Sequence, residues 1–217
     1  MWRPCVSHLT LATYTDMTDR PHSSYTPART FGLPIALGIS LVLVWLLGDG
    51  ATDLLMYQRT DIEAGQVWRL LTAHWVHLST QHLFLNLSTL AIIWWLFGDS
   101  LAGRTGYFLT GLIALGLTLS LFLLHPDVWW YAGFSGVLHG LLIAGALISR
   151  HHAPLLSLLI VLIIVIKLAL ELTLGASSTM TKFIDSPILV EAHLYGAVLG
   201  GLGVLLIELK KTVSNKI

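Results

Sequence analysis

The chain has 217 residues, of which 55% are hydrophobic and only 11% are charged, less than half the charged fraction of an average soluble domain, about 25%. This composition excludes an ordinary soluble protein and a disordered chain. Twelve basic and twelve acidic residues leave no net charge, so nucleic-acid binding has no electrostatic basis, and the single Cys5 excludes a disulfide framework and a thiolate metal cluster.

The first thirty residues are rich in Thr, Ser, Pro and His. They contain no apolar core of about 7 to 15 residues followed by a small-residue cleavage site, so they do not resemble a signal peptide. We interpret residues 1–30 as a polar N-terminal tail, with Met17 as an alternative start.

Long stretches without charge predict transmembrane helices, since a span needs roughly 20 apolar residues. Six are predicted, at about 31–48, 77–97, 105–124, 133–149, 153–172 and 188–208. The chain is therefore expected to be an all-α membrane protein with a six-helix domain at 31–208 and a short basic tail at 209–217.

The distribution of Lys and Arg predicts the orientation, because basic flanks stay preferentially in the cytoplasm. Six spans place both termini on one side, where the flanks carry eight basic residues against three on the other side. The eight are Arg3, Arg20, Arg29, Arg104, Arg150, Lys210, Lys211 and Lys216, and the three are Arg59, Arg69 and Lys182. Both termini are therefore expected in the cytoplasm, and the spans that begin near 77, 133 and 188 start at the outer face.

Strongly polar residues inside the predicted spans are few, and each is a candidate functional residue because an unpaired polar group in lipid costs several kcal/mol. They are His77, His82 and Asn86, Ser135 and His139, Lys167 and Glu171, and Glu191 and His193. His82, Asn86, Ser135 and His193 lie within about ten residues of the outer ends, or about 15 Å at 1.5 Å per residue. These four side chains can therefore share one layer of the membrane.

Ser135 lies in the sequence Gly133-Phe134-Ser135-Gly136, at the start of a predicted helix. Free backbone N–H groups and the helix dipole favour negative charge at such a position. An oxyanion formed by attack of Ser135 would be stabilised there, with His82 or Asn86 as side-chain donors. The motif predicts a serine nucleophile, whereas a packing role for its small residues is the alternative.

Two histidines are candidate bases for Ser135. His139 lies one turn away on the same helix, about 5 to 6 Å between Cβ atoms, and His193 lies on the last predicted span. Small residues that recur every fourth position allow these two helices to approach closely, which favours His193 as the base and His139 as its support. The small residues are Gly136, Gly140 and Ala144 on one helix and Ala192, Gly196 and Gly200 on the other.

Two further groups of polar residues have other interpretations. His74, His77 and His82 raise the alternative of a metal site, since imidazole is a common zinc ligand, but their spacing lacks a His-Glu-x-x-His arrangement. Lys167 and Glu171, four residues apart near the outer end of their span, are interpreted as an interfacial ion pair. We predict no metal and no cofactor.

These residues together resemble the rhomboid family of intramembrane serine proteases, a six-helix fold with a Ser-His dyad. The resemblance extends from Trp68-Arg69 in the first outer loop through the His82 region to the glycine-flanked Ser135 and His193. It implies that Ser135 is the nucleophile and His193 the general base. His82 and Asn86 would then be oxyanion donors beside the Ser135 backbone N–H, and Trp68-Arg69 would be structural.

The resemblance is greatest to the rhombosortase branch, on the residues Ser135-Gly136-Val137-Leu138-His139-Gly140 and Ala192-His193-Leu194-Tyr195-Gly196. It implies a multi-pass protein of the bacterial inner membrane. The expected partners are the lipid bilayer and membrane-anchored exported proteins, which would lose a C-terminal sorting tail that carries Gly-Gly. His139 stands where many rhomboids have an aromatic residue against the catalytic imidazole, and no carboxylate is expected to orient His193. The alternatives are an inactive rhomboid-like binding protein, a transporter or a His-liganded membrane metalloprotein.

Overall fold

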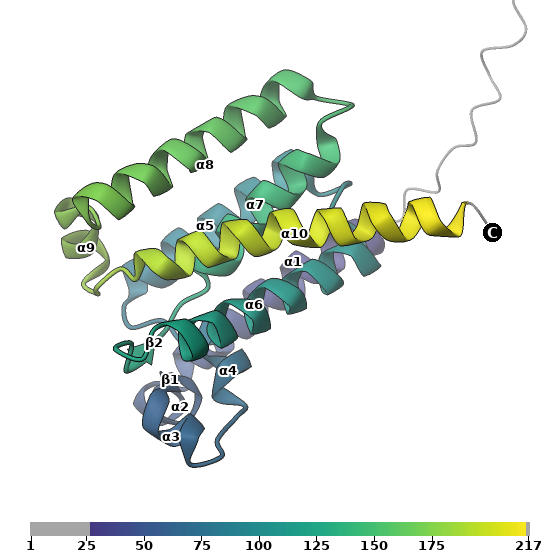
Figure 1. The fold of residues 1–217 in the computed structure, drawn as a ribbon. Helices are drawn as coiled ribbons and strands as arrows, with labels where there is room; N and C mark the ends of the chain where they lie inside the picture. The colour runs from purple at the N-terminus through teal and green to yellow at the C-terminus, as the bar shows by residue number, and fades with distance from the viewer. Residues whose placement is uncertain (1–26, 216–217) are drawn as a thin grey trace, which may run out of the picture.

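The structure, a computed structural model, describes residues 27–215 and consists almost entirely of helices (Figure 1). In this part of the chain six helices have at least 15 residues: α1 (Pro27–Leu46), α5 (Thr80–Phe97), α6 (Arg104–Leu124), α7 (Ser135–Ser149), α8 (Pro154–Leu174) and α10 (Val190–Ser214). Each overlaps one predicted span, so the predicted order of long helices is confirmed. Residues 1–26 of the predicted tail lie outside the described residues, 27–30 form the first turn of α1, and 209–214 continue α10.

The observed helix starts differ from the approximate predicted ones by one to four residues, and at α5 and α7 the cause is local. The second span was expected from residue 77, but α5 begins at Thr80 because Ser79 caps it, its Oγ accepting the His82 backbone N–H at 3.1 Å. The fourth was expected from residue 133, but Gly133 has φ +123°, a non-helical conformation that favours glycine, and α7 begins at Ser135.

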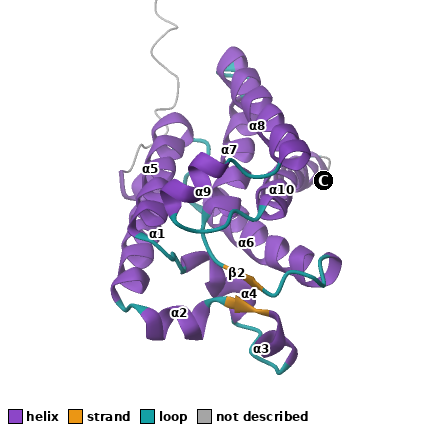
Figure 2. Cartoon of the chain, turned by 90° about the vertical axis from the view of Figure 1, so that its left-hand side faces the viewer, coloured by secondary structure: helices purple, strands orange, loops and turns teal. Residues whose placement is uncertain are grey.

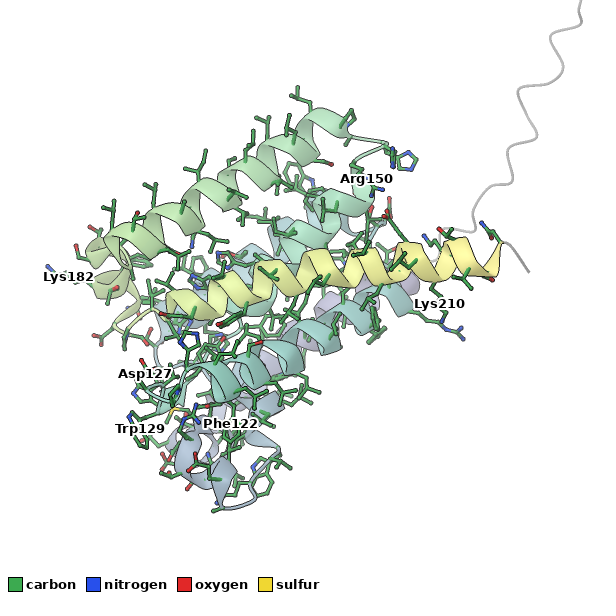
Figure 3. All side chains as sticks on the ribbon, viewed as in Figure 1. Phe122, Asp127, Trp129, Arg150, Lys182 and Lys210 are labelled. Carbon is green, nitrogen blue, oxygen red and sulfur yellow. The ribbon has the colours of Figure 1, made fainter. Side chains whose placement is uncertain are left out.

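The long helices alternate in direction, so α5, α7 and α10 begin at the same end of the bundle (Figure 1). We call it the α9 end, after the short helix α9 (Ser178–Ile184) that lies there. Asp127 and Lys182 lie at this end, whereas Arg150 and Lys210 lie at the opposite end (Figure 3). The apolar length of the bundle is thus bounded by charged residues at both ends.

The helices have the composition of a membrane bundle. Three of them, α6, α8 and α10, are long and apolar enough to cross a membrane, and α1 with α2 (Asp49–Leu55), bent by 115°, forms a fourth span if the pair is counted as one. The remaining two are α5, which carries Gln81, His82 and Asn86 in its first two turns, and α7, which has only 15 residues. Large apolar side chains such as Ile163 on α8 and Leu205 on α10 stay more than half exposed. Contiguous exposed apolar surface is typical of contact with lipid, and the chain is a multi-pass membrane protein.

The connection between α1 and α5 folds into a compact cap at the α9 end. It contains α2, β1 (Tyr57–Gln58), α3 (Arg59–Glu63), α4 (Arg69–Thr72) and the 3-10 helix η1 (Ala73–Trp75). Strand β1 pairs antiparallel with β2 (Trp130–Tyr131), which precedes α7 (Figure 2). In this pairing Tyr57 is opposite Tyr131. The cap is therefore joined to the segment that leads directly into Ser135.

Arg69 holds this cap together. Its buried guanidinium donates to the backbone oxygens of Asp53 at 2.8 Å and Met56 at 2.7 Å, and it pairs with the Asp61 carboxylate at 2.9 Å. The neighbouring Trp68 Nε1 donates to the Leu54 oxygen at 3.2 Å. These contacts are structural, as the resemblance implied for the Trp-Arg pair.

Arg59 has a structural role that its position in the sequence did not indicate. It is buried and donates to the backbone oxygens of Leu121, Phe122 and His125 at 2.8 to 3.2 Å. The last carbonyls of a helix lack partners within the helix and carry its negative dipole end. Arg59 thus binds the C-terminal carbonyls of α6 and joins that helix to the connection between α1 and α5.

Helices α7 and α10 pack backbone against backbone, as their small residues predicted. A Cβ atom on Gly196 would lie 1.9 Å from the Gly136 oxygen, and one on Gly200 would lie 2.1 Å from the Gly140 oxygen. Elsewhere on α7 the side chains of Val137, Leu138 and Leu141 are buried in the core. By contrast, only three residues of the 21-residue α8 are buried. The small-residue contact is therefore confirmed, and it fixes α10 closely against the start of α7.

Candidate active site

Ser135 is the first residue of α7, and the segment before it is held by buried hydrogen bonds. The Gly133 N–H donates to the Ala73 oxygen at 3.1 Å, and the Tyr131 hydroxyl donates to the Gly133 oxygen at 2.8 Å. Burial raises the pKa of the Tyr131 phenol, so it remains a neutral donor. The turn that presents Ser135 is thus fixed on both sides by groups outside α7.

The close contact of α7 and α10 brings Ser135 and His193 together. The distance between Ser135 Oγ and His193 Nε2 is 3.0 Å, which is hydrogen-bond length. His193 is buried in the first turn of α10. The structure therefore places these two residues as the sequence predicted, across two helices that are 58 residues apart in sequence at this point.

His139 contacts both members of this pair without contacting the serine hydroxyl. Its ring stacks on that of His193, with centroids 4.2 Å apart and planes inclined by 17°. Its Nδ1–H donates to the Ser135 backbone oxygen at 2.8 Å. His139 thus packs against the His193 imidazole as the aromatic residue of many rhomboids is expected to do. His193 is the histidine that contacts Ser135 Oγ.

His82 and Asn86 lie on one face of α5 opposite the start of α7. The His82 ring packs against Gly133, where a Cβ atom would come within 2.7 Å of His82 Cε1. Asn86 Nδ2 lies 2.8 Å from His77 Nε2, and His77 Nδ1 lies 3.2 Å from the Trp75 backbone oxygen. A carbonyl only accepts, so His77 carries its proton on Nδ1 and accepts one amide hydrogen of Asn86 at Nε2. The other amide hydrogen of Asn86 remains for a group in the cleft.

A carboxylate lies beside His193, contrary to the expectation from the sequence. Glu171 Oε2 lies 3.1 Å from His193 Nδ1, and its Oε1 lies 2.7 Å from Lys167 Nζ. The Lys167–Glu171 ion pair was predicted, but it turns toward α10 instead of lying only at the membrane interface. The sequence did mark these residues, since they are the only two charged residues inside the apolar α8. It did not show that they face α10, because the sequence of α8 does not encode the direction in which that face points.

These side chains line a single cleft of about 620 Å³ at the α9 end. It is lined by His82 and Asn86 of α5, Ser135 and His139 of α7, Lys167 and Glu171 of α8, and His193 of α10. Trp129 and Trp130 before α7, with Met180 and Ile184 of α9, form its apolar rim. The four residues predicted to share one layer, His82, Asn86, Ser135 and His193, thus line the same cleft. Gly133 and Gly136 act through packing, the first against His82 and the second against the Ala192 oxygen and Leu117.

The three histidines of the metal alternative are not arranged around one point, since the rings of His77 and His82 lie 4.9 Å apart whereas His74 is bonded to α6. His74 Nε2 lies 2.8 Å from the Ala114 backbone oxygen of α6, His77 is bonded to Asn86, and His82 packs on Gly133. Within residues 27–215 no group of three or more His, Cys, Asp or Glu side chains is arranged to hold a metal ion. His74 Nδ1 and His82 Nδ1 have no hydrogen-bond partner among the described residues, but the three side chains do not form a group that could hold a metal ion, so the metal alternative gains no support.

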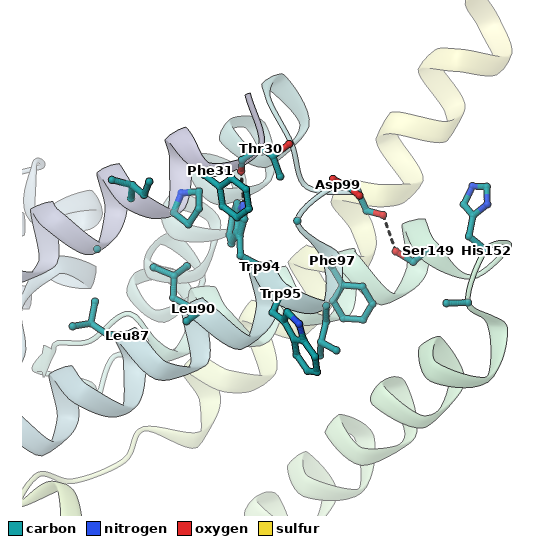
Figure 4. Close-up of a pocket in the computed structure, with 18 residues that line it drawn as sticks. Thr30, Phe31, Leu87, Leu90, Trp94, Trp95, Phe97, Asp99, Ser149 and His152 are labelled. Atoms are coloured by element: carbon teal, nitrogen blue, oxygen red, sulfur yellow. Dashed lines mark hydrogen bonds between the residues drawn. The ribbon is translucent and has the colours of Figure 1, made fainter. Parts of the chain in front are cut away.

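A second cavity, of about 790 Å³, opens at the opposite end of the bundle between α1, α5 and the turn from α7 to α8 (Figure 4). Its walls are apolar, with Leu87, Leu90 and Trp94 on one side, and Trp94 Nε1 donates to the Thr30 oxygen at 2.8 Å. Its polar lining comprises Thr30, Asp99, Ser100, Ser149 and His152. The Ser100 and Ser149 hydroxyls bond to each other at 2.7 Å, and no histidine within residues 27–215 is hydrogen-bonded to either of them.

Comparison with known proteins assigns the family. A family model described as the Rhomboid domain matches residues 64–209, which is more than half of the chain and includes α5 to α9, most of α10 and the whole Ser135–His193 cleft. No curated protein sequence matches the chain. The family resemblance predicted from the sequence is confirmed, and the chain belongs to the rhomboid family of intramembrane serine proteases.

Proposed function

We propose that the protein is an active intramembrane serine endopeptidase in which Ser135 is the nucleophile and His193 the general base. The observation that supports this proposal is the 3.0 Å contact between Ser135 Oγ and His193 Nε2 at the N-terminus of α7, inside a cleft of about 620 Å³. A serine is a weak nucleophile unless an adjacent base accepts its proton, and this pair has the required geometry.

In the proposed reaction Ser135 Oγ attacks the scissile carbonyl while its proton passes to His193 Nε2. The resulting imidazolium then donates this proton to the leaving amine, and the acyl-enzyme is hydrolysed by water or transferred to another nucleophile. His139, stacked on His193, limits the imidazole to rotation within its plane. The Ser135 backbone oxygen is bonded to His139, which fixes the first turn of α7 during this transfer.

The oxyanion is stabilised by the start of α7 and by α5. Backbone N–H groups in the first turn of a helix lack intrahelical partners and lie at the positive end of its dipole. The free amide hydrogen of Asn86 and the His82 imidazole lie across the cleft from them. Preorganised donors of this kind contribute about 3 to 4 kcal/mol each to transition-state stabilisation in other serine proteases.

The proposed membrane topology has six spans with both termini in the cytoplasm. It is supported by the six long helices, by their alternate direction and by the excess of Lys and Arg in flanks on the terminal side. The α9 end, and with it the cleft, then faces the outer side of a bacterial inner membrane.

The proposed substrates are membrane-anchored exported proteins that lose a C-terminal sorting tail with Gly-Gly before its membrane anchor. This proposal rests on the similarity of the Ser135–Gly140 and Ala192–Gly196 segments to the rhombosortase branch. The site lies close to the α9 end of the bundle, which suits a cleavage site at the start of an anchor helix.

The test is cleavage of a reporter that carries such a tail, co-expressed with the protein and followed by release of the exported part. Ser135→Ala should abolish cleavage, whereas Ser120→Ala on α6, whose hydroxyl bonds only to its own helix at 2.8 Å, should leave it intact. Undiminished cleavage in Ser135→Ala contradicts the proposed nucleophile. A reporter with Leu-Leu in place of Gly-Gly tests the substrate class separately.

The inactive and transporter alternatives are tested without any substrate. A serine-directed fluorophosphonate should label the wild-type protein at Ser135 and should not label Ser135→Ala; absence of label on the wild type favours binding without chemistry. The two histidines are then separated by His193→Ala, which should lose labelling, and His139→Phe, which keeps a ring for stacking and should retain it. The opposite result would make His139 the base.

A further inference from the structure

We propose that Glu171 is a positioning residue for His193, so that the proposed Ser-His pair works as a Ser135–His193–Glu171 arrangement across α7, α10 and α8. This inference rests on the proposed function and adds a third residue to it. It starts from one contact that links the apolar helix α8 to the site, the 3.1 Å distance between Glu171 Oε2 and His193 Nδ1.

The chemistry of the two groups determines where the imidazole proton lies. A carboxylate only accepts hydrogen bonds, so His193 Nδ1 must carry a hydrogen and donate it to Glu171. In the neutral imidazole Nε2 then has a free lone pair, and Nε2 is the atom 3.0 Å from Ser135 Oγ. Glu171 therefore selects the tautomer that can accept the serine proton, and its negative charge faces the imidazolium after transfer.

Lys167 holds the carboxylate in this orientation. Its ammonium lies 2.7 Å from Glu171 Oε1 and 3.4 Å from His193 Nδ1. With Nδ1 protonated, the second contact has no acceptor, so the lysine pairs with the carboxylate alone. The other ionisable groups that face this imidazole are His139, stacked on it from α7, and His82 across the cleft. Neither of these provides a negative charge, which leaves Glu171 as the acceptor for Nδ1.

The burial of the contact also distinguishes it from a simple surface ion pair. The side chains of His193 and Glu171 are only 8% and 13% exposed, whereas that of Lys167 is 38% exposed. Glu191, two residues before His193 on α10, does not line the cleft and makes no ion pair among the described residues. It is therefore a suitable control carboxylate at the same end of the bundle.

The experiment compares two variants that differ at Glu171 alone. Lys167→Met removes the ammonium and keeps the carboxylate on Nδ1, whereas the double variant Lys167→Met/Glu171→Met removes both charges. Replacement of a buried ion pair by apolar residues of similar volume is often neutral for stability, so α8 should remain folded. Glu191→Gln is the control.

The rate constant for fluorophosphonate labelling of Ser135 and kcat for reporter cleavage should fall in the double variant, relative to Lys167→Met, on the order of 10²- to 10⁴-fold with KM unchanged. The acid limb of the pH–rate profile should lie at lower pH in the double variant than in Lys167→Met, because the imidazolium has lost its counter-charge. Lys167→Met/Glu171→Asp should recover part of the rate. Glu191→Gln should match the wild type.

Equal rates and equal pH profiles in Lys167→Met and the double variant would overturn the positioning role and leave the proposed protease function standing. If the wild type is neither labelled nor active, the protease proposal fails instead. Independently of activity, the tautomer of His193 can be measured directly by nitrogen NMR of labelled histidine in the Ser135→Ala protein. His193 should show a protonated Nδ1 with Glu171 present and a mixture of tautomers in the double variant; an unprotonated Nδ1 with Glu171 present overturns the inference.

Discussion

Gly196 lies where α10 touches α7, and its replacement by Ala tests whether this contact sets the Ser135–His193 distance. The added Cβ would lie 1.9 Å from the Gly136 oxygen, about 1.5 Å short of the 3.4 Å at which ordinary contact begins. The obstacle is backbone and cannot rotate away, so the two helices must separate. Because Gly136 is next to Ser135, the 3.0 Å contact to His193 should then lengthen beyond hydrogen-bond range.

Two magnitudes follow from this displacement. Overpacking of a close contact costs about 1 to 3 kcal/mol, so Gly196→Ala should unfold at lower temperature in detergent. A misplacement of about 1 Å between reacting groups costs on the order of 10²-fold in rate, so fluorophosphonate labelling and reporter cleavage should fall by about this factor.

Two matched variants on the same helix isolate the cause. In Gly201→Ala the new Cβ would contact only Leu147 Cδ1, at 3.9 Å. This variant has the same gain in helix propensity as Gly196→Ala, about 1 kcal/mol, without the collision. Gly200→Ala meets the Gly140 oxygen at 2.1 Å but lies one turn further from His193, so it should lose similar stability and less activity. If Gly196→Ala unfolds and reacts like Gly201→Ala, the reasoning about this contact is refuted.

Three further substitutions test the groups that support the site. Arg59→Met should lower the free energy of unfolding by about 3 kcal/mol, measured by denaturation in detergent, because it removes the charged donor from the Leu121 and His125 oxygens and leaves the Phe122 oxygen without a partner among the described residues. Arg59→Lys should recover only part, since it cannot reach several oxygens at once. Ser79→Ala removes the α5 cap and the hydrogen bond from Ser79 Oγ to the Ile184 oxygen, so it should cost at least about 1 kcal/mol in the same assay; no change would show that both contacts are dispensable. Gly133→Ala should abolish fluorophosphonate labelling, because φ +123° is strained for Ala and the new Cβ displaces His82; Gly111→Ala, which meets no atom within 4 Å, is its control.

Much of the fold could be predicted because a membrane makes the sequence easy to interpret. Charge is excluded from lipid, so uncharged stretches fixed the order and approximate limits of the six long helices. Among the differences at their starts, those of three residues at α5 and two at α7 come from local cap and turn geometry, which depends on Ser79 Oγ and on the conformation of Gly133. Hydropathy does not report either of these features.

The candidate site could be predicted in part for a similar reason. Ser135, His193, His82 and Asn86 are strongly polar residues at similar depth, and depth follows from position within a span. The small-residue spacing of α7 and α10 further indicated that Ser135 and His193 meet. Glu171 was placed at the membrane interface instead, because rotation of α8 about its axis depends on its neighbours and not on its own apolar sequence.

By itself, therefore, the sequence determined the helices, the depth of their polar residues, the α7–α10 contact and the family resemblance. Only the tertiary structure decided which ring nitrogen faces Ser135, that His139 stacks on His193 instead of reaching the hydroxyl, and that Glu171 and Arg59 act inside the fold. The physical reason is that hydrogen bonds are directional. Composition and spacing give positions along each helix axis, whereas hydrogen bonds depend on rotation about that axis and on side-chain conformation, which packing between helices sets.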